Sequence, residues 1–276
     1  MFNFIKKIFK SNITDKEIFE KASKGDKSIL TLSKEFLTVK DKYGSTPIHC
    51  LADKGVKEVF TLPKELLMIK DNDGWTPIHG LANNGVKEVL SLDEELLMIQ
   101  DNYGNTPAHR LANNGVKEVI DLDKELLKIK DKYGRTPVLM LACTGVKEIL
   151  NLPKEFLQTC DEDGNTPIHR LALNRVKEIL KLDKSLLMIK NNKENTPIHY
   201  LASLKVRNIL KLSYDVLTTY NKDGWTPMHL LSNLGVNEVL TLPIELLKIK
   251  DNRGNTPVYY LAMNGVKIPE EYKELI

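Results

Sequence analysis

A repeat of 30 residues dominates this sequence and limits the folds that are available to it. The pattern D-x-x-G-x-T-P-x-H-x-L-A-x-x-G-V-K-E-V-L returns with almost no drift. Its eight copies begin at Asp41, Asp71, Asp101, Asp131, Asp161, Asn191, Asn221 and Asp251. A period of this length indicates a small supersecondary unit that cannot bury its apolar face alone. We therefore expect the units to stack into an elongated solenoid, in which each repeat contacts its neighbours.

Within a unit, the residues predict a turn followed by a short helix. Asp41 and Gly44 are turn residues, since Asp can bond its own backbone and Gly adopts the left-handed conformation. Thr46 is a good N-cap, and Pro47 fits the first helical turn. Gly55 then ends the helix. Apolar residues at helical spacing give this helix a buried face, namely Ile48, Leu51 and Ala52.

A second short helix is expected to follow, with Val56, Val59 and Phe60 on its apolar side. Residues 62–67 predict one more helical turn, which a proline or an aspartate opens. The second helix should therefore be shortened or broken at the same place in each repeat, at Pro63, Asp93, Pro153 and Asp183.

The repeat frame also divides the chain into segments. Residues 41–250 hold seven full repeats, 251–276 form a C-terminal capping repeat, and 11–40 form a degenerate N-terminal capping repeat that lacks Thr-Pro. Residues 1–10 predict an amphipathic helix, with apolar residues on one arc and Asn3, Lys6, Lys7 and Lys10 on the other. We expect this helix to dock on the first repeat, and contact with a membrane or another partner is the alternative.

The Gly-x-Thr-Pro-x-His motif, followed by Leu-Ala and a glycine, resembles the ankyrin repeat over about residues 41–268. Ankyrin units usually have about 33 residues, so this chain carries a shorter variant. The resemblance implies an all-α solenoid of L-shaped units with stacked helices and protruding turns. It also implies protein binding, on a concave surface that the turn tips and first helices line.

Six histidines share one repeat position: His49, His79, His109, His169, His199 and His229. Zinc ligands lie about 2.0–2.3 Å from the ion, whereas equivalent residues of stacked helices lie roughly 8–10 Å apart. We therefore predict no metal at this row. The resemblance implies instead that each histidine bonds the nearby threonine and backbone, and Leu139 and Tyr259 replace it in two units.

No catalytic motif interrupts the repeat, and each acid or nucleophile occupies a repeated structural position. We predict a protein that is not an enzyme and that has no cofactor. Cys50, Cys143 and Cys160 form neither a CxxC pair nor a disulfide framework, which favours a reducing compartment. Together with the lack of an apolar run of 18 residues, this predicts a soluble protein of the cytoplasm, or of another cell's cytosol after delivery.

Positions that vary from repeat to repeat are where a specific surface can be encoded. Trp, Tyr and Arg dominate interface hot spots. The predicted partner-binding residues, on the turns and first helices, are Tyr43, Trp75, Tyr103, Arg110, Tyr133, Arg135, Arg170, Tyr200 and Trp225. We expect them to be exposed and to bind a protein partner of a monomeric chain. Binding to a nucleic acid or a membrane surface is the alternative, and the net charge of +3 disfavours the former.

The pattern is weakest near residues 170–210. Arg175 and Lys205 replace the glycine that ends the first helix, and Glu194 replaces the turn glycine. Left-handed geometry at such residues costs roughly 1 kcal/mol each. We therefore expect this region to open more easily than its neighbours.

Overall fold

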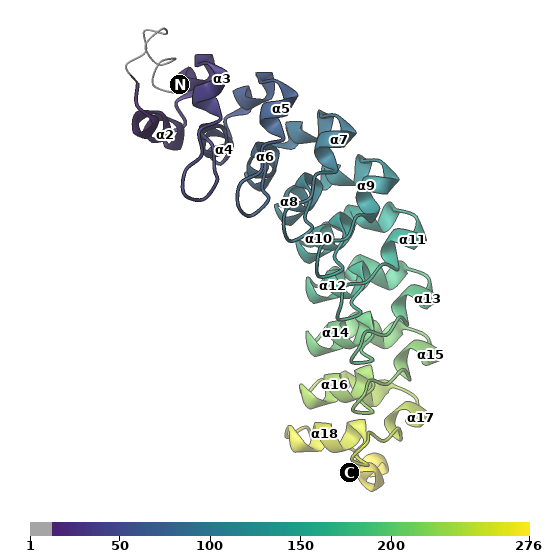
Figure 1. The fold of residues 1–276 in the computed structure, drawn as a ribbon. Helices are drawn as coiled ribbons and strands as arrows, with labels where there is room; N and C mark the ends of the chain where they lie inside the picture. The colour runs from purple at the N-terminus through teal and green to yellow at the C-terminus, as the bar shows by residue number, and fades with distance from the viewer. Residues whose placement is uncertain (1–12) are drawn as a thin grey trace. The chain divides into compact units, whose positions relative to one another are not determined.

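A computed structural model describes residues 13–276 as short helices joined by turns (Figure 1). This part of the chain contains no strand. It divides into two compact units between Lys132 and Tyr133, and within each unit the successive first helices pack against each other. The predicted class, an all-α solenoid of short stacked helices, is confirmed within each unit. The helix predicted for residues 1–10 lies outside the described residues.

Unit 1, which ends at Lys132, has three kinds of helix in each repeat. The first helices are α2 (Asp15–Ser23), α4 (Pro47–Ala52), α6 (Pro77–Asn83) and α8 (Pro107–Asn113). Next come the 3-10 helices η1 (Lys27–Thr31), η2 (Lys57–Thr61), η3 (Lys87–Ser91) and η4 (Lys117–Asp121). The repeats end with the short helices α3 (Lys34–Leu37), α5 (Lys64–Leu67), α7 (Glu94–Leu97) and α9 (Lys124–Lys128).

Unit 2, from Tyr133 onward, repeats this order. Its first helices are α10 (Pro137–Cys143), α12 (Pro167–Leu173), α14 (Pro197–Ser203), α16 (Pro227–Asn233) and α18 (Pro257–Met263). Its 3-10 helices are η5 (Lys147–Asn151), η6 (Lys177–Lys181), η7 (Arg207–Lys211), η8 (Asn237–Thr241) and η9 (Glu270–Leu275). The short helices are α11 (Lys154–Leu157), α13 (Lys184–Leu187), α15 (Tyr214–Leu217) and α17 (Ile244–Leu247).

The second helix is broken in every full repeat, as predicted at Pro63, Asp93, Pro153 and Asp183, and the break also occurs at Ser213 in the repeat that has neither proline nor aspartate there. After η2 the chain becomes extended at Leu62, and Pro63 opens the helical turn of α5. Proline lacks the N–H that a continuing helix would need, and it favours an extended residue before it. The apolar face of this segment is narrower than expected, because Val59 is fully buried whereas Val56 and Phe60 are partly exposed.

The core of each unit lies between its first helices. Ile48, Leu51 and Ala52 of α4 are fully buried, and their counterparts in α6 and α8 are equally buried. Leu66 and Leu67 of α5 close the core from the other side. The small alanine lets adjacent helices come close, so the repeats stack with little empty space.

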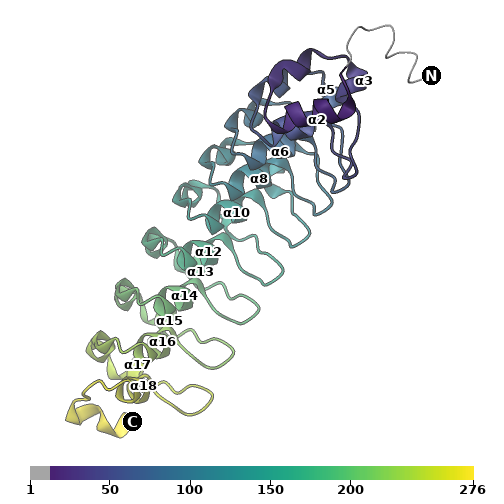
Figure 2. The same cartoon turned by 90° about the vertical axis from the view of Figure 1, so that its left-hand side faces the viewer.

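Hydrogen bonds between adjacent turns also hold the repeats in register. The backbone N–H of Asn72 donates to the carbonyl of Tyr43 at 3.0 Å, and Asn102 repeats this bond to Asp73 at 2.9 Å. Gly44 has a φ of +76°, and a Cβ there would lie 2.4 Å from Asn72 Oδ1. Glycine is therefore needed both for the backbone shape and for the close approach. In unit 2 the corresponding loops lie side by side in a row (Figure 2).

The first described repeat uses a different N-cap from the others. Thr14 caps α2 and forms a reciprocal capping box with Glu17, so the helix is nine residues long. The loss of Thr-Pro at Lys16 and Glu17 therefore moves the cap toward the N-terminus but does not remove the helix. This Thr-x-x-Glu signal is present in the sequence, but we did not predict the cap from it.

Three residues that replace glycines keep the left-handed backbone. Arg175, Glu194 and Lys205 have φ values of 59°, 57° and 59°. We expect amide hydrogen exchange away from the termini to be fastest between about residues 170 and 210, because each residue costs roughly 1 kcal/mol in this conformation. Restoring Gly at position 175 should slow exchange locally, whereas Gly85→Arg should speed exchange in unit 1. Uniform protection of all internal repeats would contradict this prediction.

Candidate partner-binding surface

The tips of the turns form a regular, exposed row in each unit. Asp41 Oδ1 accepts hydrogen bonds from the backbone N–H groups of Tyr43 at 2.8 Å and Ser45 at 2.9 Å. This bonding fixes the turn and directs its third residue outward. We call these third residues the turn row, which is Tyr43, Asp73 and Tyr103 in unit 1 and Tyr133, Asp163, Lys193, Asp223 and Arg253 in unit 2.

The histidine row joins each turn to the repeat before it. His49 Nδ1 lies 3.1 Å from the backbone nitrogen of Thr46, and a backbone N–H can only donate, so Nδ1 accepts. Nε2 therefore carries the proton and donates to the carbonyl of Trp75, 3.1 Å away in the next repeat. The Oγ1 of Thr46 lies 2.8 Å from Nδ1 as well. Both ring nitrogens thus have structural partners, and the threonine bond implied by the resemblance is present.

Burial governs the protonation of these histidines. It lowers the pKa of His79, His169 and His199 to about 4, although hydrogen bonds to backbone carbonyls oppose this shift. The neutral form, which the hydrogen bonds require, is therefore the stable one near pH 7. Within residues 13–276, no group of three His, Cys, Asp or Glu side chains is placed to hold a metal ion.

Two predicted arginines have internal partners, so the expectation that they are freely exposed was wrong. Arg110 forms an ion pair with Asp101, whose side chain is fully buried, and its guanidinium lies 4.3 Å from the ring centre of Trp75. Arg170 forms the same pair with Asp161 at 2.5 Å. Burial would raise the pKa of Asp101, but hydrogen bonds from Arg110 and the turn backbone outweigh it and hold that pKa below its usual range.

Tyrosines replace arginine at this position in two other repeats of unit 2. The Tyr200 hydroxyl accepts a hydrogen bond from Asn191 Nδ2 at 2.9 Å, and the Tyr260 hydroxyl donates to Asp251 Oδ2 at 2.6 Å. In all four cases a first-helix side chain reaches the turn residue nine positions earlier. This spacing was visible in the sequence, but we did not pair the two columns. Trp225, which packs on Tyr260 at 4.9 Å between ring centres, is likewise partly buried.

The predicted residues that remain exposed are three tyrosines of the turn row. The exposed fractions are 62% for Tyr43 and 46% each for Tyr103 and Tyr133. A cation lies over two of these rings. Lys42 is 4.8 Å from the ring centre of Tyr43, and Arg135 is 4.8 Å from the ring centre of Tyr133. In unit 1, Tyr43 belongs to the repeat before that of Trp75, and Tyr103 belongs to the same repeat as Arg110. This surface thus offers aromatic rings, hydroxyl groups and cations in a fixed order.

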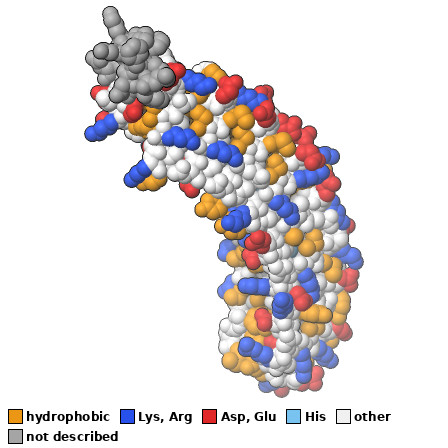
Figure 3. Space-filling model, in the orientation of Figure 1, with side chains coloured by type: hydrophobic (Ala, Val, Ile, Leu, Met, Phe, Trp, Pro, Cys, Tyr) orange, Lys and Arg blue, Asp and Glu red, His pale blue; other side chains and the backbone are white. Residues whose placement is uncertain are grey.

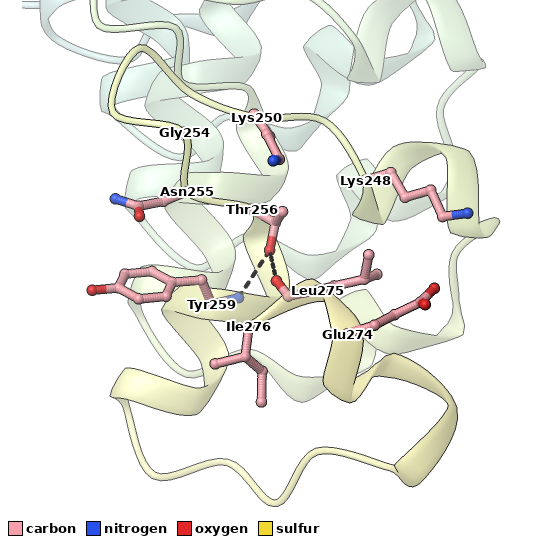
Figure 4. Close-up of a pocket in the computed structure, with 9 residues that line it drawn as sticks. All are labelled: Lys248, Lys250, Gly254, Asn255, Thr256, Tyr259, Glu274, Leu275 and Ile276. Carbon is pink, nitrogen blue, oxygen red and sulfur yellow. Dashed lines mark hydrogen bonds between the residues drawn. The ribbon is translucent and has the colours of Figure 1, made fainter.

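A recess of about 450 Å³ lies beside the last helical turn of unit 2 (Figure 4). Lys248, Lys250 and Tyr259 line it together with the segment around Leu275. The hydroxyl of Thr256 donates to the carbonyl of Leu275 and accepts from the Tyr259 N–H at 3.1 Å. Both hydrogen bonds of the Thr256 hydroxyl are therefore made within the protein, and one of them attaches the C-terminal turn.

No known protein-family model matches this chain, and no curated protein matches it either. Among the described helices, none is long and apolar enough to cross a membrane. Lysine and arginine side chains are interspersed with aspartate and glutamate over the face shown in Figure 3.

Proposed function

We propose that this chain is an ankyrin-type repeat protein that binds a protein partner through the turn row and carries out no catalysis. The strongest support is the turn row itself. Its positions vary from repeat to repeat, point outward from fixed turns, and carry tyrosines in three of eight repeats. The 30-residue Thr-Pro-x-His frame and its stacked helices support the ankyrin assignment.

The chemistry of the turn row suits a protein more than a nucleic acid. Tyrosine offers a large contact area with few rotatable bonds and a hydroxyl for hydrogen bonding. Hydrogen bonds that the turn backbone donates to Asp41 and its counterparts fix the tips, so little entropy would be lost on binding. We further propose that the chain acts as a monomer in the cytoplasm or, as an effector, in the cytosol of another cell.

Removing two exposed tyrosines should abolish capture of the partner without unfolding the chain. Affinity capture with the intact chain would be compared with a Tyr43→Ala and Tyr103→Ala variant. Buried interface anchors contribute about 2 kcal/mol each, so losing two should leave little retained partner. The circular-dichroism melt should stay unchanged, because both side chains are exposed.

The matched control removes two tyrosines that are equally exposed but lie outside the turn row. Tyr214 and Tyr220 are 53% and 58% exposed, and a Tyr214→Ala and Tyr220→Ala variant should retain the partner. If both double variants captured the same proteins as the intact chain, the turn row would not be the binding surface.

A further inference from the structure

A ladder of ion pairs runs along the 3-10 helices of each unit. The cation at the start of one 3-10 helix binds the glutamate 31 positions later, in the next repeat. In unit 1 the pairs join Lys27 to Glu58 at 2.6 Å, Lys57 to Glu88 at 2.5 Å and Lys87 to Glu118 at 3.5 Å. In unit 2, Lys147 binds Glu178 at 2.8 Å, and Arg207 binds Glu238. We call this set the ion-pair ladder.

The ladder is interrupted at Lys177. The position that supplies the glutamate elsewhere is occupied by Asn208, so the carboxylate that would neutralise Lys177 is missing. Within the described part of the chain, Lys177 forms no ion pair. Its surroundings are a surface recess of about 490 Å³, lined by Arg175, Lys177, Glu178, Leu180, Lys181 and Asn208.

Four further departures from the repeat add positive charge at the same place. Arg175 and Lys205 replace the helix-ending glycine, in spite of their left-handed φ values of 59°. Lys181 and Lys211 occupy a column that holds only Thr, Ser, Asp or Asn in the other repeats from 11 to 250. Each change affects two adjacent repeats and no others. We call Arg175, Lys177, Lys181, Lys205 and Lys211 the basic patch, and all five residues are exposed.

The nearby acids do not neutralise the basic patch. Glu178 binds Lys147, Asp215 binds Lys184 at 2.9 Å, and Glu238 binds Arg207. The cations of the basic patch themselves form no ion pair with residues 13–276. Arg175 and Lys205 both have a strained, left-handed backbone. Strain of this kind persists mainly where function requires it, so it points to a function for these two charges.

We propose that the basic patch binds an acidic segment of a partner protein, whose carboxylate takes the place of the missing glutamate at Lys177. The ion-pair ladder itself shows that this position on a 3-10 helix accepts a glutamate side chain at hydrogen-bond distance. Four of the five cations are lysines, which are point charges and lack the forked geometry that favours phosphate. The recess holds Leu180 and no aromatic ring on which a base could stack. This surface shares no residue with the turn row and does not depend on the function proposed for it.

The test measures binding of a fluorescently labelled oligoglutamate peptide to the full chain by anisotropy at low salt. Asn208→Glu restores the internal carboxylate, and Lys177→Gln with Lys181→Gln removes two of the cations. Each variant should weaken peptide binding by about tenfold, since surface ion pairs are individually modest. Lys57→Gln with Lys87→Gln is the matched control, because those lysines already bind glutamates, and it should leave peptide binding unchanged.

Several results would overturn the proposal. One is that oligoglutamate binds no better than an oligoglutamine peptide of equal length. Another is that the control variant weakens binding as much as the patch variants do. Tighter binding of a single-stranded oligonucleotide or of phosphatidylserine vesicles than of oligoglutamate, with the same loss on Asn208→Glu, would assign the patch to a different polyanion. Thermal melts of each variant show whether a loss of binding results from unfolding. Asn208→Glu should fold normally, because most repeats already carry glutamate at this position.

Discussion

Lowering the pH from about 7.5 to about 5.5 should destabilise this protein by roughly 4 kcal/mol through three buried members of the histidine row. His79, His169 and His199 are almost fully buried, and both nitrogens of each ring lie within hydrogen-bond distance of the cap threonine or of the next repeat. Burial lowers their pKa to about 4 in the folded state. In the unfolded chain the pKa of histidine is about 6.5.

The sign follows from which state takes up protons. Between about pH 6.5 and pH 4 the unfolded chain binds protons at these histidines and the folded chain does not, so stability falls as the pH falls. Their contribution is fully present above pH 6.5 and is lost toward pH 4. At pH 5.5 each of these three histidines should have lost about 1.3 kcal/mol of stabilisation.

Urea unfolding at a series of pH values would measure this effect, and the chain itself suggests the control. Leu139 occupies the histidine position in one repeat, where the cap threonine bonds only the backbone N–H of Leu139, at 3.2 Å. A His79→Leu, His169→Leu and His199→Leu variant should be less stable than the native chain at pH 7.5 but should have a flatter pH dependence. An equal slope in both proteins would show that other groups, such as carboxylates, control the loss.

Much of the fold could be predicted from the sequence because the same local signals recur in almost every repeat. The Thr-Pro caps, the glycines that end helices and the break at Pro63 or Asp93 are short-range signals, and neighbouring signals agree. The cap of α2 was missed because Thr14 lies two positions before residue 16, where the repeat frame places the N-cap. Partial exposure of Val56 and Phe60 depends on how tightly a 3-10 helix turns, which periodicity alone does not determine.

The site was harder to predict, since exposure depends on contacts between columns. Composition and variability correctly pointed to Tyr43 and Tyr103 as exposed rings, but they do not distinguish a free arginine from one that is paired within its own repeat. Arg110 and Asp101 lie nine residues apart, at a spacing that belongs to no single helix or strand. Only the turn, which folds back on the first helix, brings the two side chains together.

This pairing predicts that Arg110→Ala destabilises unit 1 by about 3 kcal/mol, because it leaves a buried carboxylate without its ion-pair partner. The side chain of Asp101 is fully buried, and that of Arg110 is 20% exposed. Removing the guanidinium also uncovers the ring of Trp75, on which it lies. Chemical unfolding with the far-ultraviolet circular-dichroism signal would measure the loss.

A compensating variant separates the ion pair from other effects of the substitution. Asn191 and Tyr200 occupy the equivalent positions in another repeat and are joined by a hydrogen bond of 2.9 Å. Copying them as Asp101→Asn with Arg110→Tyr should recover most of the stability, since the buried charge is then removed together with its partner. Tyr103→Ala, on the same turn, should change stability by less than about 0.5 kcal/mol. If Arg110→Ala left the unfolding curve unchanged, the guanidinium would be available to a partner, and Arg110 would rejoin the exposed tyrosines as a candidate anchor.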